Sequence, residues 1–227
     1  NLQQAHLIKA KLQQALLLGA NLERADLEKA DLSHANLLKT CFKYANLKWA
    51  NLSEANLQEA DLTEADCISI NAKEAKCVGT IFYKTRLQDA KLTKAFLLGA
   101  NLQYANLMTA ELKEANLGRA NLKSAYLGHA SLEGANLTSA DLRDAEFTNG
   151  TILRNANFNE CKLENSSINN AYNNLDRVVI QEKQNKYFEA QNVYRNFKKY
   201  FRDVGMYELS GEYYYRARRG QIFPLDS

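Results

Sequence analysis

The sequence predicts an all-β solenoid followed by a short helical module, and three observations carry this prediction. Leucine recurs at every fifth residue through most of the chain, starting at Leu2 and Leu7. A second ladder, almost entirely alanine, lies two residues before each leucine. After Tyr172 both ladders stop, and apolar residues recur at spacings of three and four. The change of period predicts a solenoid over residues 1–173 and a helical module over 174–227.

The five-residue period matches neither a strand, with a period of two, nor a helix, with a period of 3.6. Two inward positions separated by one outward residue describe a short extended segment, and the other two residues of each repeat must turn the chain. Large leucine and small alanine side chains alternate inward, so stacked turns can interdigitate without voids. A single turn cannot bury its own apolar side, and stability must therefore come from stacking of neighbouring turns.

The repeat resembles the A-(D/N)-L-x-x motif of pentapeptide-repeat proteins, as in ANLER at residues 20–24 and ADLEK at residues 25–29. The resemblance covers about residues 1–172 and implies a right-handed, quadrilateral β-helix with twenty residues in each coil. An internal echo supports that number, because LLLGA at residues 16–20 nearly recurs eighty residues later as FLLGA at residues 96–100. Stacked in this way, the repeats make about 8.5 coils.

Three consecutive positions of the leucine ladder lack leucine. They are held by Cys67, Ala72 and Cys77. Ile70 is large where alanine is expected, and Phe82 can fill the space left by Ala72 from the opposite wall. We interpret the disturbance as volume compensation within a packed core, and a functional buried thiol pair is the alternative.

The end of the ladder contains one extra residue. The register predicts that Phe147 and Ile152 point inward, and that the extra residue follows Ile152. Phe158, Leu163 and Ile168 then continue the pattern.

The helical module is predicted to be a hairpin of two helices. Residues 187–204 form an amphipathic pattern, Gly205 is a good terminating residue, and a second helix follows. The residues expected to pack or to form an interface are Tyr187, Tyr194, Phe197, Phe201, Tyr207, Tyr213 and Tyr214. The module either caps the open end of the solenoid alone or also contacts a partner, because tyrosine-rich surfaces suit interfaces.

Part of this module, residues 190–216, is similar to the segment that follows pentapeptide repeats in some bacterial membrane proteins with a small ion-channel pore. The family pattern is roughly Y-R-x-L-K, then G-x-Y, then F-Y-Y-R. Here Tyr194 and Arg195 match its start, and Phe197 replaces the leucine. The chain itself contains no run of apolar residues long enough to span a membrane. The similarity therefore implies a cytoplasmic regulatory part of a membrane protein whose pore segment is missing from this chain.

No residue pattern predicts catalysis, a metal or a cofactor, so we expect a protein that is not an enzyme. His6, His34 and His129 occupy outward positions, and no Ser/His/Asp or Cys/His unit can be assembled around them. The four cysteines show no C-x-x-C spacing, which argues against zinc and favours free thiols in a reducing, cytoplasmic compartment.

The charge distribution bears on the choice of partner. Residues 1–173 contain 19 Lys and Arg against 19 Asp and Glu, whereas residues 174–227 contain 10 against 7. Some pentapeptide-repeat proteins protect DNA gyrase, a topoisomerase, with rods that mimic DNA in shape and negative charge, and this is the alternative function. A neutral rod is a poor mimic of so dense a charge, and we expect no nucleic-acid partner.

The leading prediction is a protein-interaction or scaffold domain. With twenty residues in each coil, an outward apolar stripe gathers on one wall, beside Gly19, Gly79 and Gly99. A stripe that recurs at the coil period indicates an interaction surface rather than scattered apolar residues. We expect it to bind a protein, and a second copy in a homodimer is one candidate. The stripe consists of Leu16, Leu18, Leu38, Val78, Phe96 and Leu98.

Overall fold

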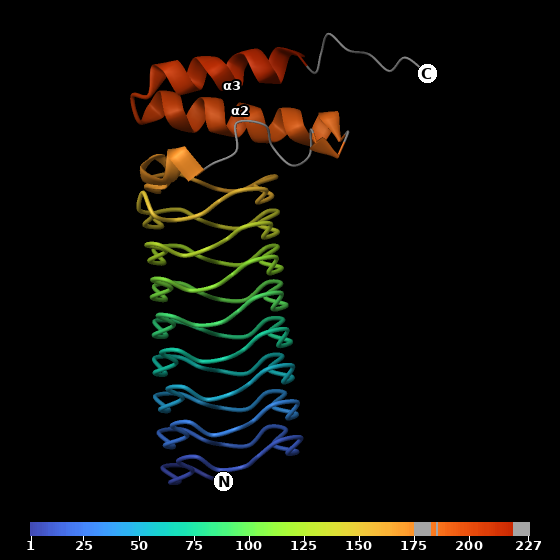
Figure 1. Cartoon of the computed structure of the whole chain (residues 1–227), viewed down its shortest axis with the longest axis vertical. Helices are drawn as coiled ribbons and strands as arrows, with labels where there is room; N and C mark the ends of the chain where they lie inside the picture. Colours follow the sequence, from blue (N-terminus) through green and yellow to red (C-terminus); the bar gives the residue numbers. More distant parts are fainter. Residues whose placement is uncertain (175–182, 185, 220–227) are drawn as a thin grey trace.

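The computed structural model describes residues 1–174, 183–184 and 186–219, which form a long rod with two helices across one end (Figure 1). Neighbouring coils stack in parallel at an offset of twenty residues. The first bridges join His6 to Asp26, Lys11 to Asp31, Leu16 to Asn36 and Asn21 to Cys41. Four bridges in each coil define four walls, so the predicted right-handed quadrilateral β-helix is confirmed.

Each five-residue repeat makes one wall and one corner. In the wall, the N–H of Leu22 donates to the carbonyl of Cys41 in the next coil, with an N···O distance of 2.8 Å. At the corner, the N–H of Ala25 donates to the carbonyl of Leu22 at 3.0 Å, which closes a β-turn. The third residue of that turn, Arg24, has a φ of 56°. Positive φ is uncommon for residues other than glycine, yet it recurs at this position along the rod, with φ between 54° and 59° for non-glycine residues.

The core consists of the two inward ladders. Leucines such as Leu22 and Leu117 are fully buried, as are their alanine companions. In the disturbed stretch, Ile70 and Ala72 are also buried, with exposed fractions of 3% and 4%, which agrees with volume compensation. The leucines of the first coil are only half-buried, because that coil has a neighbouring coil on one side only.

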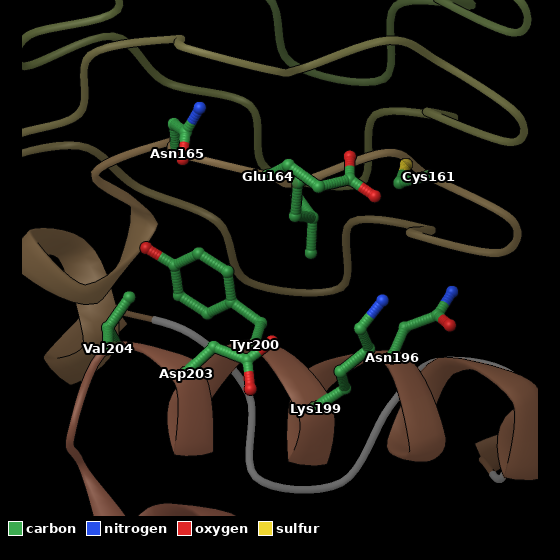
Figure 2. Close-up of a pocket in the computed structure, with 9 residues that line it drawn as sticks. Cys161, Glu164, Asn165, Asn196, Lys199, Tyr200, Asp203 and Val204 are labelled. Atoms are coloured by element: carbon green, nitrogen blue, oxygen red, sulfur yellow. The ribbon is translucent and has the colours of Figure 1, made fainter.

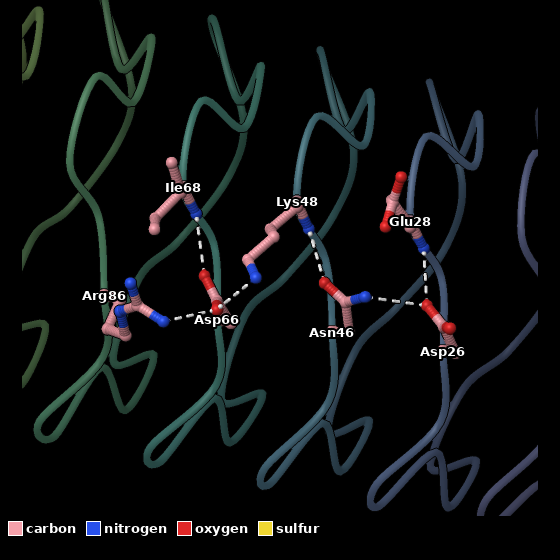
Figure 3. A network of polar contacts seen from close by, with 7 residues as sticks. All are labelled: Asp26, Glu28, Asn46, Lys48, Asp66, Ile68 and Arg86. Atoms are coloured by element: carbon pink, nitrogen blue, oxygen red, sulfur yellow. Dashed lines mark hydrogen bonds and ion pairs between the residues drawn. The ribbon is translucent and has the colours of Figure 1, made fainter.

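Outward Asn and Asp side chains stabilise the walls in two directions (Figure 3). The Oδ1 atom of Asn46 accepts a hydrogen bond from the backbone N–H of Lys48 at 3.3 Å, which holds the following corner. The Nδ2 atom of Asn46 donates to Asp26 in the previous coil at 2.8 Å. One coil further on, Asp66 lies 3.0 Å from the Lys48 ammonium and 2.6 Å from the Arg86 guanidinium. The outward polar column therefore links coils as well as capping turns.

The predicted position of the extra residue is wrong. Ile152 lies outward with an exposed fraction of 37%, whereas Leu153 is 1% exposed and continues the inward ladder. The bridge from Ser131 to Ile152 has an offset of 21 residues, so the insertion lies in the corner that precedes Thr151. Thr151 takes the small inward position because its hydroxyl donates to the carbonyl of Leu127 at 2.8 Å, which satisfies the buried polar group.

Beyond the last coil lie the 3-10 helix η1 (Ile168–Asn174) and two α-helices, α2 (Tyr187–Asp203) and α3 (Tyr207–Arg219). The predicted stop at Gly205 is confirmed, because Gly205 has a φ of 79° just after the C-cap. The N–H of Met206 donates to the carbonyl of Phe201 at 2.8 Å, and the N–H of Gly205 donates to that of Arg202 at 3.0 Å. These two bonds form a Schellman motif that ends α2 and allows α3 to fold back.

Helix α2 packs directly on the final coil (Figure 1). The ring of Phe197 lies 5.4 Å from that of Phe158, measured between centroids. The hydroxyl of Tyr200 donates to the carbonyl of Ser166 at 2.6 Å. Burial raises the pKa of the Tyr200 hydroxyl, which keeps it protonated and able to donate. Aromatic side chains of α2 therefore cover the apolar end of the core.

Candidate interaction surfaces

The six stripe residues, here called the apolar strip, lie in two columns that follow the rod axis. Bridges connect Leu16 through Asn36, Asn56 and Lys76 to Phe96, which places Leu16 and Phe96 four coils apart on one wall. The second column follows the adjacent corner and contains Leu18, Leu38, Gln58, Val78 and Leu98.

The strip is exposed to different degrees along its length. Leu16 is 83% exposed, Leu18 60%, Phe96 49% and Leu98 41%, while Leu38 and Val78 are partly exposed. Leu16 lies in the first coil, which has a neighbour on one side only, so its exposure partly reflects that position. Phe96 and Leu98 lie in the middle of the rod, where coils stack on both sides, and they remain exposed.

Glycine occupies three of the five corner positions beside the strip, and Lys39 and Glu59 occupy the other two. A side chain built at Gly19 or Gly99 would meet no atom within 4 Å. By contrast, a β-carbon at Gly118 would lie 3.2 Å from Cδ1 of Leu98, so the Leu98 side chain lies along the rod over that glycine. The corner residue that follows Leu98 therefore adds no side chain over the strip.

A second group of exposed rings lies around another wall, and the sequence reasoning missed it. The guanidinium of Arg24 lies 4.9 Å from the centroid of the Tyr44 ring, and the ammonium of Lys29 lies 4.9 Å from that of Trp49. Each cation precedes its ring by twenty residues, so the coil period could have revealed these pairs. Because each ring already stacks with a cation of its own chain, this group is partly satisfied within the rod.

The helical module buries most of its predicted aromatic residues. Tyr194, Phe197, Phe201 and Tyr213 are at most 3% exposed, and the Phe201 and Tyr213 rings stack with centroids 5.5 Å apart. Tyr200, which the sequence analysis did not select, is also buried.

The structure does not show full burial for the other three predicted aromatic residues. Tyr207 does not pack within the hairpin, because its side chain is 72% exposed at the start of α3, and an interface role for it stays a prediction. Tyr214 is half-buried, with the Lys198 ammonium 4.3 Å and the Arg218 guanidinium 5.3 Å from its ring centroid. The side chain of Tyr187 lies outside the described residues.

A cavity of about 250 Å³ lies between part of α2 and the last coil (Figure 2). Charged groups of both signs line it, Glu164 from the rod and Lys199 and Asp203 from α2. The Tyr200 hydroxyl at its edge is already bonded to the rod. Across the described part of the chain, no group of three or more His, Cys, Asp or Glu side chains gathers in a metal-binding arrangement. We interpret the cavity as a gap in the packing of the cap.

Comparison with known proteins identifies the repeat. Eight copies of the family model "Pentapeptide repeats" match residues 1–37, 40–76, 80–118 and 115–150. The chain belongs to the pentapeptide-repeat family. Its solved relatives include HetL from the cyanobacterium Nostoc sp. strain PCC 7120, a pentapeptide-repeat protein involved in regulating heterocyst differentiation. HetL is 30% identical over 73% of this chain and 86% of its own, with a TM-score of 0.40.

A second solved relative is QnrB1, a plasmid-mediated fluoroquinolone resistance protein. It is 21% identical over 77% of this chain and 93% of its own, with a TM-score of 0.35. No curated protein matches the chain.

On this pentapeptide-repeat rod, oppositely charged side chains form ion pairs along the rod axis. Lys39 lies 3.4 Å from Glu59, Lys94 lies 3.7 Å from Glu114, and Lys113 lies 3.4 Å from Glu133, each pair one coil apart. The balance of 19 basic and 19 acidic residues in the rod is therefore also a local balance along its corners. His34 joins this pattern, with its Nδ1 atom 3.5 Å from Glu54, and both side chains are exposed.

All four cysteines of the pentapeptide-repeat chain carry free thiols. Cys67, Cys77 and Cys161 are buried, and burial raises the pKa of each thiol, that of Cys77 to about 12. Cys41 is half-buried at an outward position. A thiol of such high pKa is almost entirely protonated near neutral pH, so the buried cysteines act as core side chains.

Proposed function

We propose that the chain is a non-catalytic interaction domain that presents its apolar strip to a protein partner. The observation that carries this proposal is the exposure of Phe96 and Leu98 in the middle of a rod whose inward leucines are fully buried. The core is complete without these side chains, so the fold does not need them. Apolar surface left in water loses about 25 cal/mol per Å² relative to burial, which favours contact with a partner.

The charge pattern argues against a nucleic-acid partner and against DNA mimicry directed at a topoisomerase. Axial ion pairs such as Lys39–Glu59 and Lys113–Glu133 alternate the sign of charge along the rod. DNA carries one negative charge per ~1.7 Å of helix axis, and a rod with alternating signs neither mimics nor neutralises that density. The DNA-mimic alternative therefore receives no support from the surface of the rod.

A finer proposal follows from residues 190–216, which resemble the segment after the repeats in ion-channel-like membrane proteins. No described helix combines the length and the apolar run that a membrane crossing needs. We propose that the chain acts as the cytoplasmic regulatory part of such a protein, and the free thiols fit a reducing compartment. Fractionation of cells that carry the full-length gene product tests this idea: membrane association supports it, and full recovery with unanchored proteins contradicts it.

The interaction proposal is tested by photo-crosslinking in cells. A photoreactive residue replaces Leu98 in one variant and Met108 in a matched control. Met108 occupies the same position of its five-residue repeat on a different corner and is 38% exposed, close to the 41% of Leu98. We expect a protein adduct at position 98 and not at position 108. Failure to form an adduct at position 98, or equal adducts at both positions, contradicts the proposal.

A further inference from the structure

Along both columns of the apolar strip, apolar and polar residues follow the same order from either end of the column. The corner column runs Leu18, Leu38, Gln58, Val78, Leu98, with a single amide at its centre and two apolar residues on each side. The wall column runs Leu16, Asn36, Asn56, Lys76, Phe96, with apolar residues at both ends. Both columns are centred on the same coil, that of Asn56 and Gln58.

This pattern is the one that an antiparallel pair of rods requires. In a dimer whose two-fold axis lies in the interface and across the rods, each column faces its own copy in reverse order. With the axis at Gln58, Leu18 then faces Leu98 of the second copy, and Leu38 faces Val78. At the axis, each Gln58 faces its counterpart, and an amide carries both donors and an acceptor, so this pair can hydrogen-bond.

We propose that the apolar strip joins two copies of this chain side by side, antiparallel, with the two-fold axis at Gln58. This proposal rests on the proposed function, because it names the partner of the surface described there. The nearly repeated sequences at residues 16–20 and 96–100 are then two halves of one self-complementary surface.

The charges beside the strip are compatible with the antiparallel arrangement. In the antiparallel pair Lys76 faces Asn36, and Lys39 faces Gly79, whose missing side chain leaves room. Of these three charged residues, only Glu59 faces its own copy. Each Glu59 is already paired with Lys39 of its own chain, 3.4 Å away.

The size of the strip sets the expected strength of the contact. Four coil spacings of about 4.8 Å make a strip about 19 Å long. A standard interface buries about 800 Å² on each partner, and a strip one wall wide over this length covers less. We therefore expect a weak, concentration-dependent dimer rather than an obligate one, with both halves of the strip needed for binding.

Disulfide crosslinking of the purified chain tests the register, in a Cys41→Ser background that leaves only buried native thiols. Four single-cysteine replacements are compared under oxidising conditions: Leu18→Cys, Gln58→Cys, Leu98→Cys and, as the control, Met108→Cys. The antiparallel pair predicts a covalent dimer of Gln58→Cys alone. It also predicts mixed dimers when Leu18→Cys is combined with Leu98→Cys. Leu98→Cys alone should stay monomeric, because its two copies lie about 19 Å apart, beyond the ~7 Å that a disulfide can bridge.

Sedimentation velocity over a range of concentrations supplies the second readout. We expect self-association of the parent chain, weakened at least about tenfold by Leu18→Asp combined with Leu98→Asp and unchanged by Met108→Asp. Self-crosslinking of Leu98→Cys, or a monomeric parent chain without a Gln58→Cys dimer, overturns the antiparallel pair. If the photoreactive residue at position 98 meanwhile captures a different protein in cells, the interaction function stands and only the second copy is wrong as its partner.

Discussion

Replacement of Leu117 by alanine tests the core in the middle of the rod. Leu117 is fully buried, and the same inward position in the coils before and after it is held by Leu97 and Leu137. Its backbone N–H donates to the carbonyl of Asn136 at 2.7 Å, a bond that the substitution leaves in place. The change therefore removes side-chain packing alone.

The expected loss follows from how little the site can relax. Leucine-to-alanine changes in protein cores cost about 2–5 kcal/mol, and the cost rises with the size of the cavity that remains. Coils on both sides are fixed by hydrogen bonds, because Asn116 donates to Ala95 while Leu117 donates to Asn136. The nearest inward neighbours in sequence, Ala115 and Ala120, are too small to fill the space. We therefore expect a loss of about 3–5 kcal/mol, in the upper part of that range.

The assay is equilibrium unfolding in denaturant, with Lys113→Ala as the control. Lys113 belongs to the same coil, is exposed, and pairs with Glu133 at 3.4 Å, so its loss should cost within about 0.5 kcal/mol. The midpoint should fall for Leu117→Ala with little change in the denaturant slope. Equal losses for the two variants would refute the assignment of inward and outward positions.

Three further predictions concern the thiols, the cap and the strip. Under native conditions a thiol reagent should modify Cys41 well before Cys67, Cys77 and Cys161, and rapid modification of all four would show that the core opens. Tyr200→Phe should lower the free energy of unfolding by about 0.5–1.5 kcal/mol through loss of the bond to Ser166, measured against Tyr207→Phe, whose exposed hydroxyl should not matter. Leu18→Asp with Leu98→Asp should leave the unfolding midpoint close to that of the parent chain, and a large fall would mean that the strip belongs to the core.

Much of the fold could be predicted because one local rule repeats. The leucine and alanine ladders define the inward positions, and the echo between residues 16–20 and 96–100 gives the coil length before any contact is known. The corner conformation is imposed by the stacked coils, so residues as different as Arg24 and Trp49 adopt the same positive φ. In a repeat fold, an average over many copies outweighs the preference of any single residue.

The errors occur where the repeat ends or a polar side chain decides. At the insertion, Ile152 fits the ladder by type, yet Thr151 lies inward because its hydroxyl finds a buried carbonyl. Tyr207 has the helical spacing of the buried residues Ser210, Tyr213 and Ala217, but it is the first residue of α3 and its side chain stays exposed. Periodicity alone could not show either contact.

The apolar strip was predicted as a set of residues, because the coil period places them together. Its symmetry about Gln58 depends on which coils stack, and it becomes visible once the bridges from Leu16 to Phe96 are known. The cation–ring pairs on the other wall lie at outward corner positions, where the leucine and alanine ladders carry no signal. The family resemblance supplied the handedness, which spacing does not determine.

The central claim is that a protein partner covers the apolar strip in cells. Thiol accessibility tests this claim most directly. Leu98→Cys and Met108→Cys, each in the Cys41→Ser background, are treated with a membrane-permeant thiol reagent in cells and again as dilute purified chain. Both positions are exposed in the isolated chain, at 41% and 38%, so both should react quickly in dilute solution. If a partner covers the strip, only position 98 becomes strongly protected in cells. Equal labelling of the two positions in cells would contradict it.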